Sequence, residues 1–124
     1  MSKVFKGNIV IVDDDVLVRQ SIGDCMESAG YAVESFGSAE EFLASGSAQN
    51  AACLIVDIQL PGITGLELQG KLAGVDNHVP IVFVSGQGID ANREKAMRQG
   101  AAGFLSKPFR RDDLMKLVGA AIQR

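Results

Sequence analysis

Short apolar runs of strand length alternate along this chain with longer segments whose apolar residues recur at helical spacing. The runs occupy residues 8–12, 31–36, 52–57, 80–85 and 102–106. The helical segments occupy residues 14–29, 38–45, 64–73 and 90–99, and a last segment places Leu114, Leu117, Val118, Ala121 and Ile122 on one face. This alternation predicts an α/β fold in which helices cover both faces of a parallel sheet.

Local signals support these elements. Gly30 follows the first helical segment, as a glycine that ends a helix does. Ser38, with Glu41 three residues later, forms a capping-box signature for the second segment. The first, third and fourth apolar runs are nearly all apolar, which is typical of central parallel strands, whereas the more polar second run is expected near a sheet edge.

Polar residues with metal or phosphate chemistry stand at the strand ends. They are Asp13, Asp14, Asp57, Ser85 and Lys107. The carboxyl ends of parallel strands meet at one edge of the sheet, where ligand sites form. Each residue alone has an ordinary explanation as a turn, cap or surface residue. Together, three carboxylates, a hydroxyl and an ammonium indicate a divalent-cation site that supports phosphoryl transfer to a carboxylate.

Composition and charge narrow the function classes. The 124 residues are enough for one domain, and a net charge of −3 with a pI near 5.0 gives no reason to expect nucleic-acid or membrane binding. No apolar run approaches the ~20 residues that span a bilayer, and the N-terminus lacks a signal-peptide core. Cys25 and Cys53 are expected to be reduced core thiols of a cytosolic protein, and His78 is expected in an exposed loop.

Four motifs carry a resemblance to a known family: "VDD" after the first run, "LIVDIQLPGITGLEL", "IVFVSG" and "GAAGFLSKPF". In this order they resemble the receiver domain of a bacterial two-component response regulator, over residues 1–124 with a structured core of roughly 8–123. The resemblance implies a (βα)5 flavodoxin-like or CheY-like three-layer sandwich with strand order 2-1-3-4-5. "LPGITGLEL" and "SGQG" are similar to regulators with helix-turn-helix outputs, which implies transcriptional control through an output domain absent from this chain.

The resemblance assigns a role to each strand-end residue. Asp57 would be the phosphoacceptor that attacks a phosphohistidine of a partner kinase. Asp13, Asp14 and Asp57 would hold Mg²⁺ together with the backbone carbonyl of Gln59. Ser85 and Lys107 would each bind a phosphoryl oxygen.

Three further positions match the family pattern. Phe104 would be the aromatic switch residue that turns inward when Ser85 moves toward the phosphate. The Lys107–Pro108 peptide would be cis, an isomer that X–Pro bonds adopt at low cost. Gln59 and Gln87 would flank the route of attacking water and affect the lifetime of the phosphoryl group.

The acidic triplet leaves one aspartate without a family role. The family uses two acids here, and Asp13 with Asp14 is the better match. Asp15 is then expected at the start of the following helix, where an acidic side chain interacts favourably with the helix dipole. The shifted pair, Asp14 with Asp15, stays open as an alternative.

The expected switch face comprises the fourth helix, the fifth strand and the fifth helix. The segment 90–99 has only Ala91, Ala96 and Met97 as apolar residues, so it should be the least firmly docked helix. In the family this face mediates dimerisation or partner binding; a merely solvated charged surface is the alternative. The implied partner is a sensor histidine kinase or a phosphotransfer protein in the cytoplasm. Neither direct nucleic-acid binding nor action on external metabolites is expected.

Two other functions remain to be weighed. A flavodoxin-like or nucleotide-binding protein of the same fold would need a phosphate-binding loop after the first strand, where this chain has "DDDVLVR". A receiver-like module that acts only through protein interaction, without phosphorylation, would not need every site position to be filled. The filled positions favour the phosphorylated receiver.

Overall fold

The computed structural model describes residues 7–86 and 90–123. Its strands are β1 (Asn8–Val12), β2 (Ala32–Phe36), β3 (Cys53–Asp57), β4 (Ile81–Ser85) and β5 (Gly103–Ser106). Its α-helices are α1 (Val16–Ser28), α2 (Ala39–Ser45), α3 (Gly65–Gly74), α4 (Asp90–Arg98) and α5 (Arg111–Ile122), and a 3₁₀ turn, η1, spans Ser47–Gln49. The described chain thus alternates strand and helix throughout, as the apolar pattern predicts.

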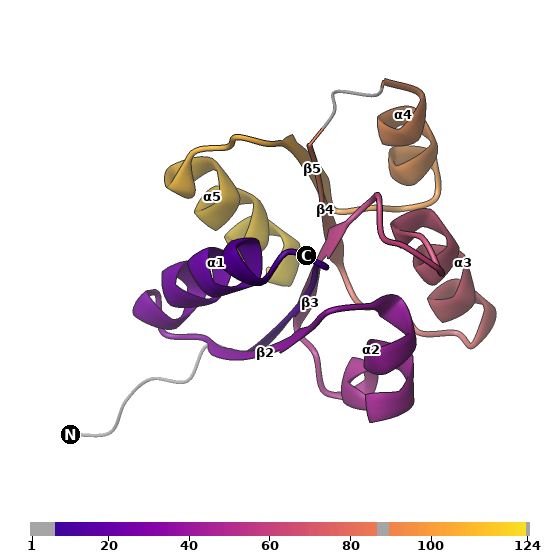
Figure 1. The fold of residues 1–124 in the computed structure, drawn as a ribbon, viewed down its shortest axis with the longest axis horizontal. Coiled ribbons are helices and arrows are strands. Elements are labelled where there is room, and N and C mark those ends of the chain that lie inside the picture. Colours follow the sequence, from indigo (N-terminus) through magenta and orange to yellow (C-terminus); the bar gives the residue numbers. More distant parts are fainter. Residues whose placement is uncertain (1–6, 87–89, 124) are drawn as a thin grey trace.

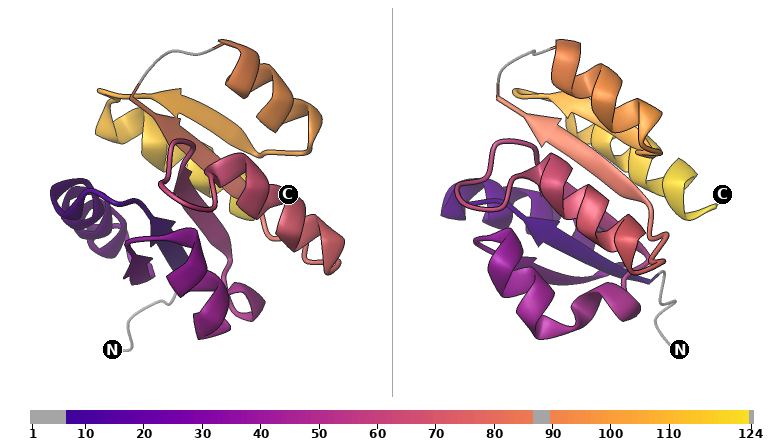
Figure 2. Two further views of the ribbon diagram at one scale, coloured as in Figure 1. Left: turned by 45° about the vertical axis from the view of Figure 1, so that its right-hand side comes forward. Right: turned by 90° about the vertical axis from the view of Figure 1, so that its right-hand side faces the viewer.

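The strands form one parallel sheet in the order β2-β1-β3-β4-β5. Helices α1 and α5 cover one face of this sheet, and α2, α3 and α4 cover the other (Figure 1). The two turned views in Figure 2 show the same three layers from the side. The predicted three-layer sandwich and its strand order are confirmed.

Alternate residues of the central strands supply two hydrophobic cores. On β1, Val10 and Val12 belong to the core under α2, α3 and α4, whereas Ile9 and Ile11 belong to the core under α1 and α5. Apart from Asn8, the side chains of β1, β3 and β4 are buried on both faces, which explains why their sequences read as nearly continuous apolar runs. Each fully buried aliphatic side chain contributes about 1.5–3 kcal/mol.

Helix starts differ from the apolar pattern where a polar side chain caps the helix. The first helix begins at Val16 rather than at residue 14, because Asp15 is its N-cap. Ser38 accepts the backbone N–H of Glu41 at the start of α2, as its motif predicts. At α3, Thr64 and Glu67 form a full capping box that the sequence analysis missed, and these hydrogen bonds lower the pKa of Glu67.

The cysteines and the histidine lie as expected. Cys25 and Cys53 are free, and burial of Cys53 raises its pKa to about 12, so its thiol is neutral. His78 is exposed and its Nε2 lies 2.7 Å from Oδ1 of Asp76. Among the described helices, none is both long enough and apolar enough to cross a bilayer.

Candidate functional site

The predicted site residues come from four adjacent strands of the sheet. Asp13 follows β1, Asp57 ends β3, Ser85 ends β4 and Lys107 follows β5. Parallel pairing in the order β1-β3-β4-β5 places all four at the carboxyl edge of the sheet. The fold therefore brings residues that span 94 positions of the chain into direct contact.

Three carboxylates converge at this edge. One carboxylate oxygen from each of Asp13, Asp14 and Asp57 lies within 4.8 Å of the others. Asp13 and Asp57 are buried, with 1% and 7% of their surface exposed, whereas Asp14 faces solvent. The cluster is therefore most open to solvent at Asp14.

The carboxylate of Asp15 caps helix α1. Its Oδ1 accepts the backbone N–H groups of Leu17 at 2.9 Å and of Val18 at 3.3 Å, which makes it the N-cap of α1. The structure thus brings Asp13 and Asp14 to Asp57 and uses Asp15 to start a helix. This is the arrangement expected when the first two acids form the pair.

The carboxylate of Asp13 is fixed at both oxygens. Oδ1 accepts the backbone N–H of Asp15 at 2.9 Å, and Oδ2 accepts Nζ of Lys107 at 3.1 Å. Burial raises the pKa of Asp13 despite these hydrogen bonds, and the neighbouring charge of Asp57 acts in the same direction. A second positive charge at this place would favour the ionised form.

The carboxylate of Asp57 is held in a similar way. Oδ2 accepts Nζ of Lys107 at 3.2 Å, and Oδ1 accepts the backbone N–H of Gln59 at 2.9 Å. The side chain of Gln59 is exposed. Its carbonyl oxygen, the expected metal ligand, stays a prediction.

Lys107 is the cation between the two buried carboxylates. Partial burial alone would lower its pKa, but the hydrogen bond to Asp13 and the charges of Asp13 and Asp57 outweigh burial and raise it. Its backbone N–H donates to the carbonyl of Ser85 at 2.6 Å. The Lys107–Pro108 peptide is cis, as expected.

The expected switch residues, Ser85 and Phe104, lie on the neighbouring strands β4 and β5. Ser85 is fully buried at the end of β4, where it pairs in register with Ser106. Phe104 is half-buried and packs against the core under α2, α3 and α4. Gln87 lies outside the described residues.

Sequence reasoning missed two residues that shape this edge. Arg19 of α1 donates from Nη1 to the backbone carbonyl of Asp13 at 2.6 Å. Gly65 begins α3 so close to β3 that a Cβ would lie 2.7 Å from the carbonyl oxygen of Asp57 and 2.8 Å from Cα of Ile58. A glycine after the loop "IQLPGIT" signals a close approach, but which backbone it approaches is visible only in the fold.

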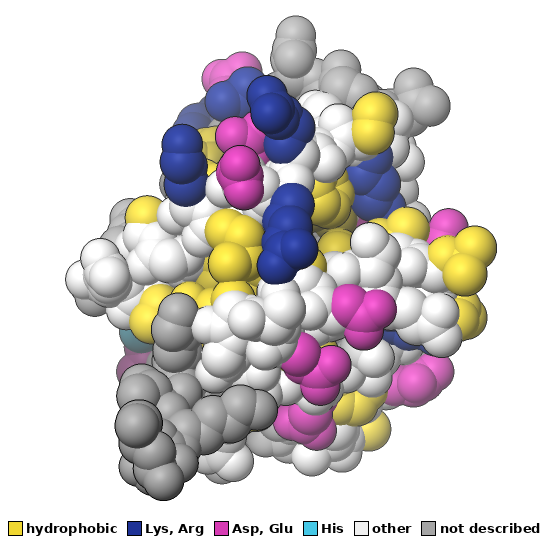
Figure 3. Space-filling model, turned by 90° about the vertical axis from the view of Figure 1, so that its left-hand side faces the viewer, with side chains coloured by type: hydrophobic (Ala, Val, Ile, Leu, Met, Phe, Trp, Pro, Cys, Tyr) yellow, Lys and Arg dark blue, Asp and Glu magenta, His cyan; other side chains and the backbone are white. Residues whose placement is uncertain are grey.

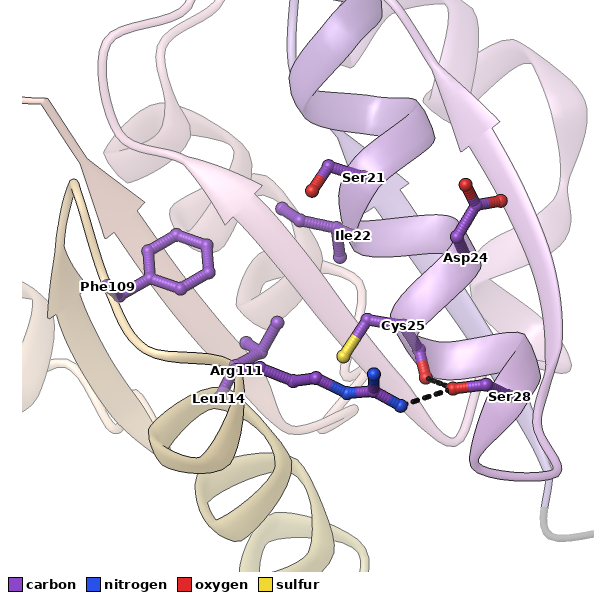
Figure 4. A pocket seen from close by; sticks show the side chains of 8 residues that line it. All are labelled: Ser21, Ile22, Asp24, Cys25, Ser28, Phe109, Arg111 and Leu114. Atoms are coloured by element: carbon purple, nitrogen blue, oxygen red, sulfur yellow. Dashed lines mark hydrogen bonds between the residues drawn. The ribbon is translucent and has the colours of Figure 1, made fainter.

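A cavity of about 520 Å³ lies elsewhere, between α1 and α5 (Figure 4). Its lining residues are Ser21, Ile22, Asp24, Cys25, Ser28, Phe109, Arg111 and Leu114. Nη2 of Arg111 donates to Oγ of Ser28 across its lower rim at 2.6 Å. Figure 3 shows this side of the molecule, where hydrophobic side chains lie between basic and acidic ones. With a single carboxylate, this cavity is no candidate for the predicted chemistry.

The geometry of the sheet edge agrees with a sequence match. Residues 9–119 match the response regulator receiver domain. The chain belongs to this family. Receiver domains of two-component systems interact with histidine kinases or phosphotransfer proteins, so the predicted class of partner is that of the family.

Similar proteins include transcriptional regulators. Nodulation protein W of Bradyrhizobium diazoefficiens is 41% identical over 119 residues, which cover 96% of this chain and 52% of that protein. Transcriptional regulatory protein FixJ of the same organism is 34% identical over 119 residues, which cover 96% of this chain and 58% of that protein. The solved structure of response regulator StyR matches with a TM-score of 0.86 and 36% identity, covering 94% of this chain and 60% of that one. The receiver domain thus spans about half the length of the curated relatives it matches.

Proposed function

We propose that this receiver domain is the phosphoacceptor of a two-component system and that Asp57 takes the phosphoryl group. The observation that carries the proposal is the convergence of Asp13, Asp14 and Asp57 at one sheet edge, with Lys107 bonded to the two buried carboxylates. Of the three acids, Asp57 lies on the central strand, between the acidic end of β1 and the Ser85 end of β4. A phosphoacceptor at this place is flanked by the acidic residues after β1 on one side and by Ser85 on the other.

The transfer is a substitution at phosphorus. A carboxylate oxygen of Asp57 forms the new P–O bond, and the P–N bond of the partner's phosphohistidine breaks with its electron pair on the imidazole nitrogen. Lys107 offers its ammonium to one phosphoryl oxygen, and Ser85 offers its hydroxyl to another. The ammonium of Lys107 thereby compensates part of the negative charge on the phosphoryl group, and the hydroxyl of Ser85 donates a hydrogen bond to it.

The donor set fits Mg²⁺. All the groups are hard oxygen ligands, and three carboxylates against one ammonium leave negative charge to be compensated. Asp13, Asp14, Asp57 and the carbonyl of Gln59 would hold the ion, which when bound neutralises charge on the carboxylates and the phosphoryl oxygens. Among the described residues, Lys107 supplies the only cationic side chain bonded to the carboxylates of Asp13 and Asp57.

An apolar surface beside the cluster suits a phosphodonor protein. Val16 is 52% exposed and Leu17 is 74% exposed in the first turn of α1, directly after the acidic triplet. We infer that a sensor histidine kinase or phosphotransfer protein in the cytoplasm docks here, with its histidine facing the Asp14 side of the cluster. Large exposed apolar side chains at a site mouth are common at protein contacts.

Phosphorylation would be read out on the face of α4, β5 and α5. Among the described side chains of α4, residues 92–98, only Ala96 is buried, so this helix is held by little apolar contact. Movement of Ser85 and Phe104 toward the phosphate would shift α4, and homodimerisation through this face is the proposed consequence. Because relatives such as FixJ are transcriptional regulators, the output is proposed to be transcriptional control by a further domain. The domain's own chemistry is limited to its phosphorylation and dephosphorylation.

The test is phosphorylation by a small donor. The protein is incubated with acetyl phosphate and Mg²⁺, and intact mass spectrometry should detect one acid-stable, base-labile phosphoryl adduct. Asp57→Asn should abolish it, whereas Asp24→Asn, an exposed acid on α1, should not. Uptake by Asp57→Asn at the wild-type rate would show that the acceptor is another residue. If no adduct forms, and if the protein binds its partner equally well with and without acetyl phosphate and Mg²⁺, the phosphorylation-independent interaction module is favoured.

Beryllofluoride gives a second, non-covalent test. This phosphoryl mimic should bind only when Mg²⁺ is present. Binding of equal strength in EDTA would contradict the role of the three carboxylates as metal ligands.

A further inference from the structure

Arg19, on the second turn of α1, reaches back to the acidic loop that precedes its own helix. We propose that Arg19 is a positioning residue for the acidic cluster, because its guanidinium fixes the peptide that joins Asp13 to Asp14 and thereby aims both carboxylates at Asp57. This inference rests on the proposed function, in which those carboxylates bind Mg²⁺. Arg19 itself belongs to neither the metal ligands nor the phosphoryl-binding groups.

The hydrogen bonds of Asp13 show what Arg19 adds. The backbone N–H of Asp13 donates to the carbonyl of Phe36 at 3.1 Å, and its two carboxylate oxygens accept from Asp15 and Lys107. Its carbonyl oxygen accepts Nη1 of Arg19 at 2.6 Å, a short charge-assisted bond in a partly buried place. That carbonyl belongs to the peptide group that links Asp13 to Asp14. Rotation of this peptide would swing Asp14 away from Asp57, and the guanidinium opposes that rotation.

The end of β2 makes room for this contact. Gly37 directly follows β2, and a Cβ at this position would lie 3.3 Å from Nη1 and 3.9 Å from Cζ of Arg19. Gly37 is not among the residues with positive φ, so its backbone conformation does not require glycine. The guanidinium is the nearest group that a side chain at position 37 would meet. Glycine at this position therefore leaves room for the guanidinium of Arg19.

A positioning role and a purely electrostatic role predict opposite signs. If Arg19 acted only through its positive charge, it would repel Mg²⁺, and removing it would strengthen metal binding. If Arg19 acts by holding the Asp13–Asp14 peptide, removing it lets the carboxylates move apart, and metal binding weakens. Residues that orient metal ligands typically account for 10–100-fold in affinity.

The experiment is calorimetric titration of the metal-free protein with MgCl₂. Arg19→Gln should bind Mg²⁺ on the order of ten-fold more weakly than the wild type. Arg19→Lys, which keeps the charge and can still donate a hydrogen bond, should recover part of that loss. Lys116→Gln removes the same charge from an exposed site on α5 and serves as the matched control, with affinity close to that of the wild type. Affinity of Arg19→Gln equal to or tighter than that of the wild type would overturn the positioning role.

Two further measurements separate this inference from stability and from the proposed function. Gly37→Ala keeps Arg19 and its charge, but its Cβ requires the guanidinium to shift. It should therefore also weaken Mg²⁺ binding, while the melting temperature of the metal-free protein stays close to that of the wild type. Hydrogen exchange at the Asp15 amide, which bonds to Asp13, should be faster in Arg19→Gln; unchanged exchange would count against the inference. If the wild type itself binds no Mg²⁺, the proposed function fails, whereas wild-type binding with unaffected variants refutes only the role of Arg19.

Discussion

Helices α1 and α4 both follow the carboxyl edge of the sheet, yet they are held in different ways. Helix α1 buries Ile22, Gly23 and Met26 and is capped by Asp15, whose neighbour Asp13 belongs to the acidic cluster. Helix α4 buries only Ala96 among its described side chains, residues 92–98. A polar contact joins it to α3, because Nε2 of Gln69 donates to the carbonyl of Ala96 at 3.1 Å.

In the proposed function, this difference meets two separate requirements of the site. Carboxylates that bind an ion must keep their relative positions, and α1 is packed and hydrogen-bonded so that they do. A helix that reports phosphorylation must be able to move at small free-energy cost, and α4 has little buried apolar surface to lose. The hydrogen bond from Gln69 lies near the C-terminal end of α4, at the carbonyl of Ala96.

The largest expected effect comes from truncating one methionine on each helix. Met26 is fully buried on α1, so Met26→Ala should lower the free energy of unfolding by about 2–5 kcal/mol. Met97 is 44% exposed on α4, so Met97→Ala should lower it by less than about 0.5 kcal/mol. Urea unfolding followed by circular dichroism measures both. Equal losses would mean that the two helices are docked alike.

A smaller effect is expected at the start of α1. Asp15→Ala removes the side chain that caps two backbone N–H groups and should lower the free energy of unfolding by about 1 kcal/mol. Asp15→Asn should be nearly neutral, because asparagine caps as well as aspartate. A loss of phosphorylation in Asp15→Asn, in a folded protein, would instead indicate that Asp15 belongs to the metal-binding pair.

The smallest effect is local and concerns α4. Gln69→Met removes the donor to Ala96, a bond of about 1 kcal/mol, and also removes a buried Oε1 for which the described residues supply no partner. Global stability should therefore change little, while exchange of the Ala101 amide, which bonds to the same carbonyl, becomes faster. Gln20→Met on the exposed side of α1 is the control. Unchanged exchange at Ala101 would mean that apolar contact alone holds this end of α4.

A last test concerns sign rather than size. Burial raises the pKa of Asp13, so the metal-free fold favours its protonated form. The corresponding stability is present below the ordinary aspartate pKa of about 3.9 and is lost as pH rises through the raised pKa. In EDTA, the unfolding free energy of the wild type should therefore decrease relative to that of Asp13→Asn as the pH rises through this window. Saturating Mg²⁺ should remove this decrease. An increase of the wild-type unfolding free energy relative to that of Asp13→Asn over the same window in EDTA would contradict the burial effect.

Much of the fold follows from the sequence because parallel strands that are buried on both faces read as apolar runs. The predicted bounds of β1 agree with the structure, and those of the other strands differ by one residue at their first position. The predicted start of the first helix lies two residues before the observed start, because apolar periodicity does not distinguish a cap such as Asp15 from a helical residue. Topology alone then places the strand-end side chains at one edge.

The remaining features of the site depend on contacts that no local pattern encodes. Arg19 is spaced like a surface residue of an amphipathic helix, and its role appears only when the carbonyl of Asp13 is seen to face it. Gln69 is a polar residue in a helical segment, and its burial depends on where α4 packs. The direction of the Asp15 side chain, which caps α1, is likewise visible only in the fold.

The order of the strands also has a consequence for biosynthesis. Asp13 and Asp57 belong to the first and third strands, whereas their shared cation, Lys107, follows the last strand, 94 and 50 residues later. During synthesis, Asp13 and Asp57 therefore leave the ribosome well before Lys107, whose ammonium compensates their charge. Until β5 docks, a nascent chain carries two like charges at an unfinished edge, which disfavours early closure of the sheet there. If Asp57 accepts a phosphoryl group as proposed, this competence arises late in synthesis, and a phosphorylated molecule is one whose last strand is in place.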